Sequence, residues 1–243
     1  NKNQYACSMY HDLISPITNI KTNLPEINVD EQEKIPNSVL IHPGVRKMSA
    51  QKGMTKTVSA DIWAKTIELL LKQGKHVILA GGPDDEKVIE EIEKYLKNSG
   101  KWKVENGNLN TTPTLALPTG EGTETLPSSI VKMSEGQKGV GQFSNFYGKT
   151  KNLKDLAILI GRAEKFICSD SAPLHIAVAM KTKTYPIFGP TDDKKLIPQK
   201  DFVIPIKSKK QCPIAPCLWE KRQTTCNKLD CLKFNIYDIV KEI

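Results

Sequence analysis

Short apolar runs alternate along this chain with longer segments in which apolar residues recur every three or four positions. The short runs end in polar or glycine-containing turns and predict β-strands. These strands cover residues 38–42, 75–80, 165–168, 185–188 and, at one edge, 202–206. The amphipathic segments predict helices, which cover residues 59–73, 85–98, 152–163, 175–180 and 236–243. Strands and helices that alternate at this spacing favour an α/β fold with a parallel sheet and right-handed crossovers.

Two parts of the chain depart from this pattern. Residues 1–36 are polar and contain several prolines, so we interpret them as a linker or the remnant of a preceding domain, and residues 37–243 as the folded domain. Within that domain, residues 101–144 are rich in Gly, Pro, Thr, Asn and Ser without a sustained period. This composition predicts a disordered insertion more than a functional lid.

Residues 166–191 describe a strand, a polar turn, a short helix and a second strand. The first apolar run stops before Asp170-Ser171, and Pro173 stands where a first helical residue needs no N–H. Open α/β sheets bind ligands beyond the carboxyl ends of their strands, where a helix N-terminus offers N–H groups to an anion. Asp170, Ser171 and His175 are therefore candidate ligand contacts. The alternative is a capping Ser-Asp pair beside a surface histidine.

Glycine-containing loops follow the other predicted strands. They are His42-Pro43-Gly44, Gly81-Gly82-Pro83 and Gly189-Pro190-Thr191. Because the carboxyl ends of parallel strands share one edge, we expect these loops to converge on the turn at Asp170. The candidate contacts that they contribute are His42, Gly44, Gly82 and Thr191. Neither GxGxxG nor GxxxxGK[ST] occurs, which gives a dinucleotide dehydrogenase or a P-loop NTPase little support.

The formal net charge of +8 favours anionic partners such as nucleotides, phosphosugars or an acidic lipid surface. The lysines lack interleaved aromatic residues, so we expect no nucleic-acid partner. No run approaches the ~20 apolar residues that a membrane helix needs, and the first residues do not have the layout of a secretory signal.

Six motifs, in order, resemble the C-terminal, donor-binding domain of glycosyltransferase family 9, the ADP-heptose:lipopolysaccharide heptosyltransferase-like family. They are VLIHPG (39–44), KTVSADIW (56–63), HVILAGGPDDE (76–86), FYGKTKNLKDLAILIGRAE (146–164), SDSAPLHIA (169–177) and PIFGPTD (186–192). The resemblance implies a Rossmann-like parallel sheet flanked by helices, the C-terminal half of a GT-B glycosyltransferase. It also implies that this half binds most of an activated sugar nucleotide.

The resemblance assigns catalytic roles to three residues. Asp170 matches the carboxylate of the D-[ST]-G-x-x-H signature, which lies beside the donor phosphate and sugar. His175 matches the signature histidine, which donates to a phosphate or sugar oxygen as the leaving nucleotide gains charge. Lys56 matches a lysine whose ammonium offsets the diphosphate charge in the transition state, whereas the alternative is a solvated lysine.

Further matches join the donor-binding set. Glu86 matches an acidic residue that contacts the ribose, although Asp85 is an equally near candidate. Lys149 lies in the fourth motif and Ser171 in the fifth. Ala172 belongs to the same set but departs from the family pattern, since the signature has Gly there and the added methyl could crowd a diphosphate.

The family's catalytic base is an acidic residue of the N-terminal domain, which deprotonates the acceptor hydroxyl. No residue of this chain matches that domain, and the chain does not begin with Met. We therefore expect the chain to supply the donor site of a longer enzyme and to lack the N-terminal catalytic domain.

Four cysteines in segment 212–231 stand as C-x4-C-x8-C-x4-C. They are Cys212, Cys217, Cys226 and Cys231. Four thiolates could bind a structural Zn²⁺ tetrahedrally, although x4 spacing is looser than the common x2 spacing. The alternatives are an iron–sulfur ligand set and plain thiols that pack a small subdomain. A similar Cys-rich tail occurs in the family, and we expect catalysis itself to need no cofactor.

These features predict an inverting glycosyltransferase of the heptosyltransferase type. Its expected donor is a nucleotide-diphosphate sugar, with an ADP-sugar favoured, and its acceptor a glycolipid or oligosaccharide of the lipopolysaccharide type. We expect a cytoplasmic protein that associates peripherally with the inner face of the membrane through its basic surface. The opposing hypothesis is a truncated or degenerate nucleotide-sugar-binding module without activity, and a third is a GT-B-like sugar-nucleotide epimerase.

Overall fold

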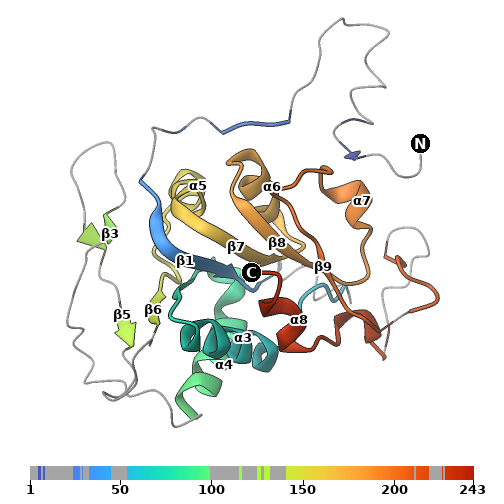
Figure 1. Cartoon of the computed structure of the whole chain (residues 1–243), viewed down its shortest axis with the longest axis horizontal. Helices are drawn as coiled ribbons and strands as arrows, with labels where there is room; N and C mark the ends of the chain where they lie inside the picture. The colour runs from blue at the N-terminus through green and yellow to red at the C-terminus, as the bar shows by residue number, and fades with distance from the viewer. Residues whose placement is uncertain are drawn as a thin grey trace, which may run out of the picture.

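The computed structural model describes residues 5, 6, 8, 24–27, 29, 33–44, 54–98, 115–116, 125–126, 129–131, 141–210, 212–218, 226 and 228–243. Most of the predicted linker 1–36 and of the predicted insertion 101–144 lies outside these ranges. The described residues build a seven-stranded sheet with helices on both faces (Figure 1). The predicted α/β class and Rossmann-like arrangement are confirmed.

The strands of the sheet lie in the order β5-β6-β2-β1-β7-β8-β9. Their bounds are β1 Ile35–His42, β2 His76–Leu79, β5 Ser129–Val131, β6 Gln142–Asn145, β7 Ala163–Ser169, β8 Lys183–Phe188 and β9 Ile206–Lys207. All neighbours pair in parallel except β5, which is antiparallel to β6. A separate antiparallel pair joins β3 (Leu115–Ala116) to β4 (Thr125–Leu126).

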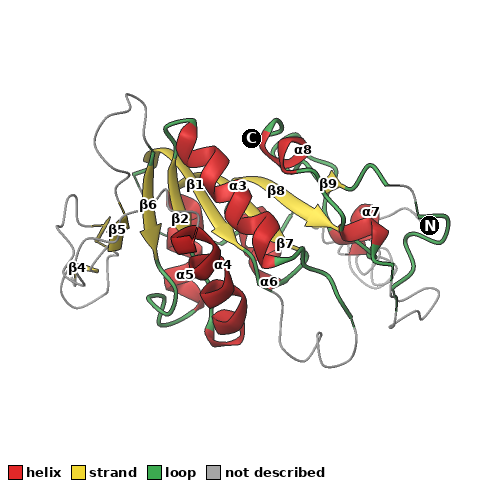
Figure 2. Ribbon diagram, turned by 90° about the horizontal axis from the view of Figure 1, so that it is seen from below, coloured by secondary structure: helices red, strands yellow, loops and turns green. Residues whose placement is uncertain are grey.

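Helices α3, α4 and α8 cover one face of the sheet, and α5 and α6 cover the other (Figures 1 and 2). The α-helices are α3 Ala60–Lys72, α4 Glu86–Asn98, α5 Leu153–Arg162, α6 Ala172–Ala179, α7 Asp193–Leu196 and α8 Ile236–Val240. Short 3-10 turns η1 (Pro83–Asp85) and η2 (Asp230–Leu232) complete the set. Among the helices in the described ranges, none has both the length and the apolar character needed to span a bilayer.

Each face of the sheet carries its own hydrophobic core. In β1, Val39 and Ile41 point toward the core under α3, where Trp63 is fully buried, while Leu40 points toward the core under α5 and α6. A parallel strand covered on both faces needs apolar residues at successive positions, which explains the uninterrupted run in β1.

Several elements differ from their sequence-based predictions. Strand β6 was not predicted, because its four residues include three polar ones and follow a Gly- and Ser-rich stretch; it pairs with β2, and its buried Ser144 bonds His76 at 2.9 Å. The edge strand is β9 at 206–207 instead of 202–206, and α6 begins three residues earlier than predicted. A 3.6-residue period could not locate the start of α6, since every residue of this helix except His175 is apolar.

The chain reverses its direction across the sheet between β1 and β7. From β1 it proceeds outward through β2 to β6, and after α5 it returns to β7 and proceeds through β8 to β9. Open α/β sheets bind their ligands at such a switch point, outside the carboxyl ends of the two central strands. The fold therefore places the loops after β1 and β7 side by side, and these loops carry several predicted site residues.

Candidate functional site

Hydroxyl groups hold the loops after β1 and β7 together at the switch point. The Oγ of Ser169, at the end of β7, lies 2.8 Å from the carbonyl oxygen of Pro43, and the Oγ1 of Thr57 lies 2.7 Å from the same oxygen. Trp63 donates its indole N–H to Thr57 Oγ1 at 3.2 Å, which ties this network to the first turns of α3. Sequence analysis missed Thr57 and Ser169, because small hydroxyl residues carry no motif of their own.

The loop before α3 delivers Lys56 to the Asp170 carboxylate. The Lys56 Nζ lies 3.0 Å from Asp170 Oδ2, and the two side chains are only 12% and 4% exposed. Asp170 follows β7 directly and precedes the N-terminus of α6, so the ion pair stands at the positive end of that helix. Two residues separated by 114 positions in the chain, both predicted as site residues, are thus brought together.

His175 lies one turn into α6, with an exposed side chain. Partial desolvation lowers the pKa of His175, the Lys56 charge acts in the same direction, and the Asp170 charge opposes both. The imidazole is therefore neutral at neutral pH and offers one N–H and one lone pair. The structure thus unites the three predicted catalytic residues in one electrostatic group.

His42 and Asp85 form a second buried pair, at the ends of β1 and β2. The His42 Nε2 lies 3.5 Å from Asp85 Oδ2, which also accepts the Gly82 N–H at 2.8 Å. Burial lowers the pKa of His42 and raises the pKa of Asp85, while the attraction between them opposes both shifts. Within the described residues, the His42 Nδ1 is buried without a hydrogen-bond partner.

The structure separates the two acidic candidates that the sequence left open. Asp85 is buried and turned toward His42, whereas Glu86 is exposed at the start of α4. Gly82 has open space where a side chain would project, so a ligand can approach its backbone. Lys149 is half-buried in the loop after β6, whose Gly148 donates its N–H to the Gly81 carbonyl at 3.3 Å.

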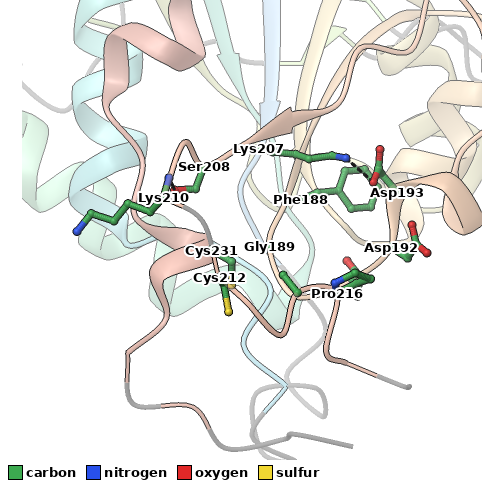
Figure 3. Close-up of a pocket in the computed structure, with 12 residues that line it drawn as sticks. Phe188, Gly189, Asp192, Asp193, Lys207, Ser208, Lys210, Cys212, Pro216 and Cys231 are labelled. Carbon is green, nitrogen blue, oxygen red and sulfur yellow. Dashed lines mark hydrogen bonds and ion pairs between the residues drawn. The ribbon is translucent and has the colours of Figure 1, made fainter. Parts of the chain in front are cut away.

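The remaining donor-binding candidates lie around the loops after β7 and β8. Ser171 immediately precedes α6, and its hydroxyl lies 3.3 Å from the Ser169 carbonyl oxygen, while Ala172 is exposed in the first turn. Thr191 is buried, and among the described residues its hydroxyl has no hydrogen-bond partner. It lines a pocket of about 250 Å³ in which Lys207 reaches Asp193 at 2.6 Å (Figure 3). The lining of this pocket includes none of the three predicted catalytic residues.

The four thiols of segment 212–231 gather around one cavity of about 230 Å³. Burial and the neighbouring thiols raise the pKa of Cys217, and they raise that of Cys231 to about 11. All four are free thiols, and in the described part of the chain no group of three or more His, Cys, Asp or Glu is arranged to hold a metal ion. The thiol chemistry suits zinc but the present arrangement does not, so the metal site stays a prediction.

The Cys-rich segment supports the loop after β8. The backbone N–H groups of Cys217 and Leu218 both donate to the Pro190 carbonyl at 3.0 Å. Met54 and Thr55, just before Lys56, line the same cavity as the four thiols. The segment therefore packs directly behind two loops of the site, whether or not it binds an ion.

Comparison with known proteins finds one family and several solved structures that are similar to this chain. Residues 128–227 match the family described as glycosyltransferase family 9 (heptosyltransferase). Among solved structures, the glycosyl transferase family 9 from Veillonella parvula DSM 2008 is similar with a TM-score of 0.51 and 16% identity, over 83% of this chain and 48% of that chain. None of the curated proteins compared with this chain matches it.

Two E. coli proteins are similar at a lower level. ADP-heptose lps heptosyltransferase II has a TM-score of 0.45 and 17% identity, over 81% of this chain and 42% of its own. Heptosyltransferase WaaC with ADP has a TM-score of 0.47 and 15% identity, over 84% of this chain and 51% of its own. The chain thus spans about half the length of these solved structures. Over residues 128–227, which contain the last three of the six sequence motifs, the match to glycosyltransferase family 9 (heptosyltransferase) agrees with the resemblance, and the Veillonella structure shares the α/β fold.

Proposed function

We propose that this chain supplies the donor site of a heptosyltransferase-type glycosyltransferase. The donor is a nucleotide-diphosphate sugar, with an ADP-sugar favoured, and the acceptor is a lipopolysaccharide-like glycan or glycolipid. The observation that carries the proposal is the buried Lys56–Asp170 pair beside His175 at the N-terminus of α6. Solved structures similar to this chain include a heptosyltransferase with ADP, which agrees with this choice of donor.

In the proposed reaction, an acceptor hydroxyl oxygen attacks the anomeric carbon of the sugar. The bond between that carbon and the diphosphate oxygen breaks, and the nucleoside diphosphate leaves with the electron pair. Lys56 offsets the charge that grows on the leaving diphosphate, and His175 donates its N–H to a phosphate or sugar oxygen. Asp170 holds the Lys56 ammonium in place at 3.0 Å.

The acceptor hydroxyl also loses a proton, and we propose that its base comes from a segment that faces this sheet edge, outside residues 37–243. Glu86, with its exposed carboxylate at the start of α4, is suited to a ribose hydroxyl. Gly44, Gly82, Lys149 and Ser171 would line the nucleotide and phosphate path. The basic surface would attract an anionic glycolipid at the cytoplasmic face of a membrane.

Calorimetric titration with ADP-, GDP- and UDP-sugars tests the donor assignment. We expect an ADP-sugar to bind best, and we expect both Asp170→Ala and His175→Ala to weaken it. Lys72→Ala removes an exposed lysine at the end of α3 that precedes β2, away from the site, and should leave binding unchanged. Unchanged affinity in both site variants would refute the assignment.

A second candidate is a module that binds the donor without turning it over. The observation that favours it is Ala172, whose methyl occupies the first turn of α6 where a diphosphate approaches the backbone. Ala172→Gly separates the two. The comparison is made with the segment that supplies the base present: a gain in sugar transfer to a lipopolysaccharide-type acceptor then supports an enzyme, whereas tight donor binding with no transfer by either form supports the module.

A further inference from the structure

Asp85 occupies a position that the site does not otherwise explain. It lies in η1, directly after the Gly81-Gly82 loop, and its carboxylate is buried although most of the neighbouring side chains are exposed. A buried carboxylate is unfavourable unless it is paired and hydrogen-bonded. Its pairing therefore indicates what the residue does.

The Asp85 carboxylate contacts the loops after two different strands. Its Oδ2 accepts the Gly82 N–H at 2.8 Å, within its own loop, and lies 3.5 Å from the His42 Nε2 at the end of β1. Both partners present a donor, because a neutral His42 that faces a carboxylate carries its proton on Nε2. The carboxylate thus accepts a hydrogen bond within its own loop, lies at ion-pair distance from His42, and points into the protein.

The space around Asp85 is shaped for this carboxylate. A Cβ built on Gly44 would lie 1.6 Å from Asp85 Oδ1 and 2.1 Å from its Cγ, and one built on Gly81 would lie 3.0 Å from the Asp85 Cβ. Only glycine at position 44 lets the two loops approach so closely. By contrast, Gly82 has no atom within 4 Å of its Cβ position, so its outer side is open to a ligand.

We propose that Asp85 is a positioning residue, which fastens the loop after β1 to the loop after β2 so that His42, Gly44 and Gly82 hold one fixed arrangement for the donor. This inference rests on the proposed function for the identity of the donor. It assigns the ribose contact to the exposed Glu86 and an internal role to its neighbour Asp85.

A double-mutant cycle tests the contact. Gly44→Ala, Asp85→Ala and the double variant are compared in the full chain by urea unfolding and by titration with ADP. Gly44→Ala forces its methyl into the carboxylate, so we expect it to unfold at lower urea than the wild type and to bind ADP at least about tenfold more weakly. Asp85→Ala should weaken ADP binding about 5- to 10-fold.

In the double variant the Gly44 methyl no longer meets the carboxylate, although the Cβ at position 85 would still lie 2.9 Å away. We therefore expect the double variant to be no worse than Gly44→Ala alone, in unfolding and in ADP binding. Asp85→Asn keeps the shape and an oxygen for the Gly82 N–H, so it should retain more affinity than Asp85→Ala. Asp84→Ala, an exposed change in the same turn, is the control and should leave ADP binding unchanged.

NMR titration of the His42 ring gives an independent readout. Because the Asp85 charge raises the pKa of His42, Asp85→Asn should move that pKa further down. Additive effects of the two substitutions on unfolding, or an unmoved His42, would overturn the inference. Coupling in unfolding together with a wild type that fails to bind ADP would instead contradict the proposed function.

Discussion

The Lys56–Asp170 pair gives the sharpest test of how the site is built. Lys56→Ala removes the ammonium that lies 3.0 Å from a carboxylate that is 4% exposed, and the carboxylate loses this ion-pair partner. Removal of one partner from a buried pair costs about 3–5 kcal/mol, because the remaining charge stays desolvated. Lys56 is 12% exposed and His175 lies nearby, so we expect a loss near the lower end, about 3 kcal/mol.

Urea unfolding at pH 7 measures this loss. With a urea dependence of about 2–3 kcal/mol per molar, the midpoint should fall by roughly 1–1.5 M. The matched control is Lys65→Ala, which breaks an ion pair of similar length, 3.1 Å to Asp61, whose lysine is 59% exposed. A surface pair of this kind contributes less than ~1 kcal/mol, so its midpoint should scarcely change.

A third variant separates stability from ligand binding. Lys56→Met combined with Asp170→Leu replaces both charges by apolar side chains of similar volume and should recover most of the lost stability. It should not recover binding of an ADP-sugar, since both charges that position the diphosphate are gone. If Lys56→Ala lowers the free energy of unfolding no more than Lys65→Ala does, the Lys56–Asp170 pair contributes no more than a surface contact. The reasoning from burial is then refuted.

Three further predictions concern other parts of the chain. Lowering the pH from 7.5 to 5.5 should reduce the free energy of unfolding, because burial lowers the pKa of His42 and His76 in the folded chain. As the pH falls, the unfolded chain therefore takes up protons near pH 6.5 before the folded chain does. Urea midpoints measured at the two pH values check this. Gly141→Ala should destabilise by about 1–3 kcal/mol, since its Cβ would lie 2.2 Å from the Lys75 carbonyl oxygen, whereas thermal unfolding of Gly82→Ala should match the wild type. Metal analysis decides between zinc and plain thiols in segment 212–231: about one equivalent of zinc per chain would support the metal site, and less than a tenth of an equivalent would refute it.

The elements with a clear period could be predicted from the sequence. Helix α3 begins after Ser59 as predicted and ends at Lys72, one residue before the predicted end, and Asn152 caps α5 by accepting the Asp155 N–H at 2.9 Å. Strand β6 could not be predicted, because three of its four residues are polar and its buried Ser144 is held by a contact with His76 of a distant strand. Pairing with β2 determines that these residues form a strand, and the hydrophobic pattern of one sequence gives no information about such pairing.

The site divides in the same way. The loops that meet at the switch point follow from strand order, which the alternation of elements indicates, and the Asp170 turn was found by its place before a helix. The sequence could not show whether Asp85 or Glu86 faces a ligand, because the two residues are adjacent. In the structure Asp85 is buried and Glu86 is exposed. The inward direction of Asp85 depends on Gly44, which lies 41 residues away and has no Cβ to clash with the Asp85 carboxylate.

Charge balance explains why the site combines a buried ion pair, Lys56–Asp170, with an exposed histidine, His175. The Lys56 ammonium has three N–H donors, so it can keep Asp170 and still bind a phosphate oxygen, and donor binding need not break the buried pair. The pair itself is neutral, however, and cannot balance a diphosphate. Under the proposed function, further positive potential comes from Lys149, from the N-terminus of α6 and from His175, whose lowered pKa an arriving anion would raise. Under the proposed function, Asp170 therefore fixes the Lys56 ammonium that faces the leaving diphosphate, and His175 adds a charge that responds to the ligand.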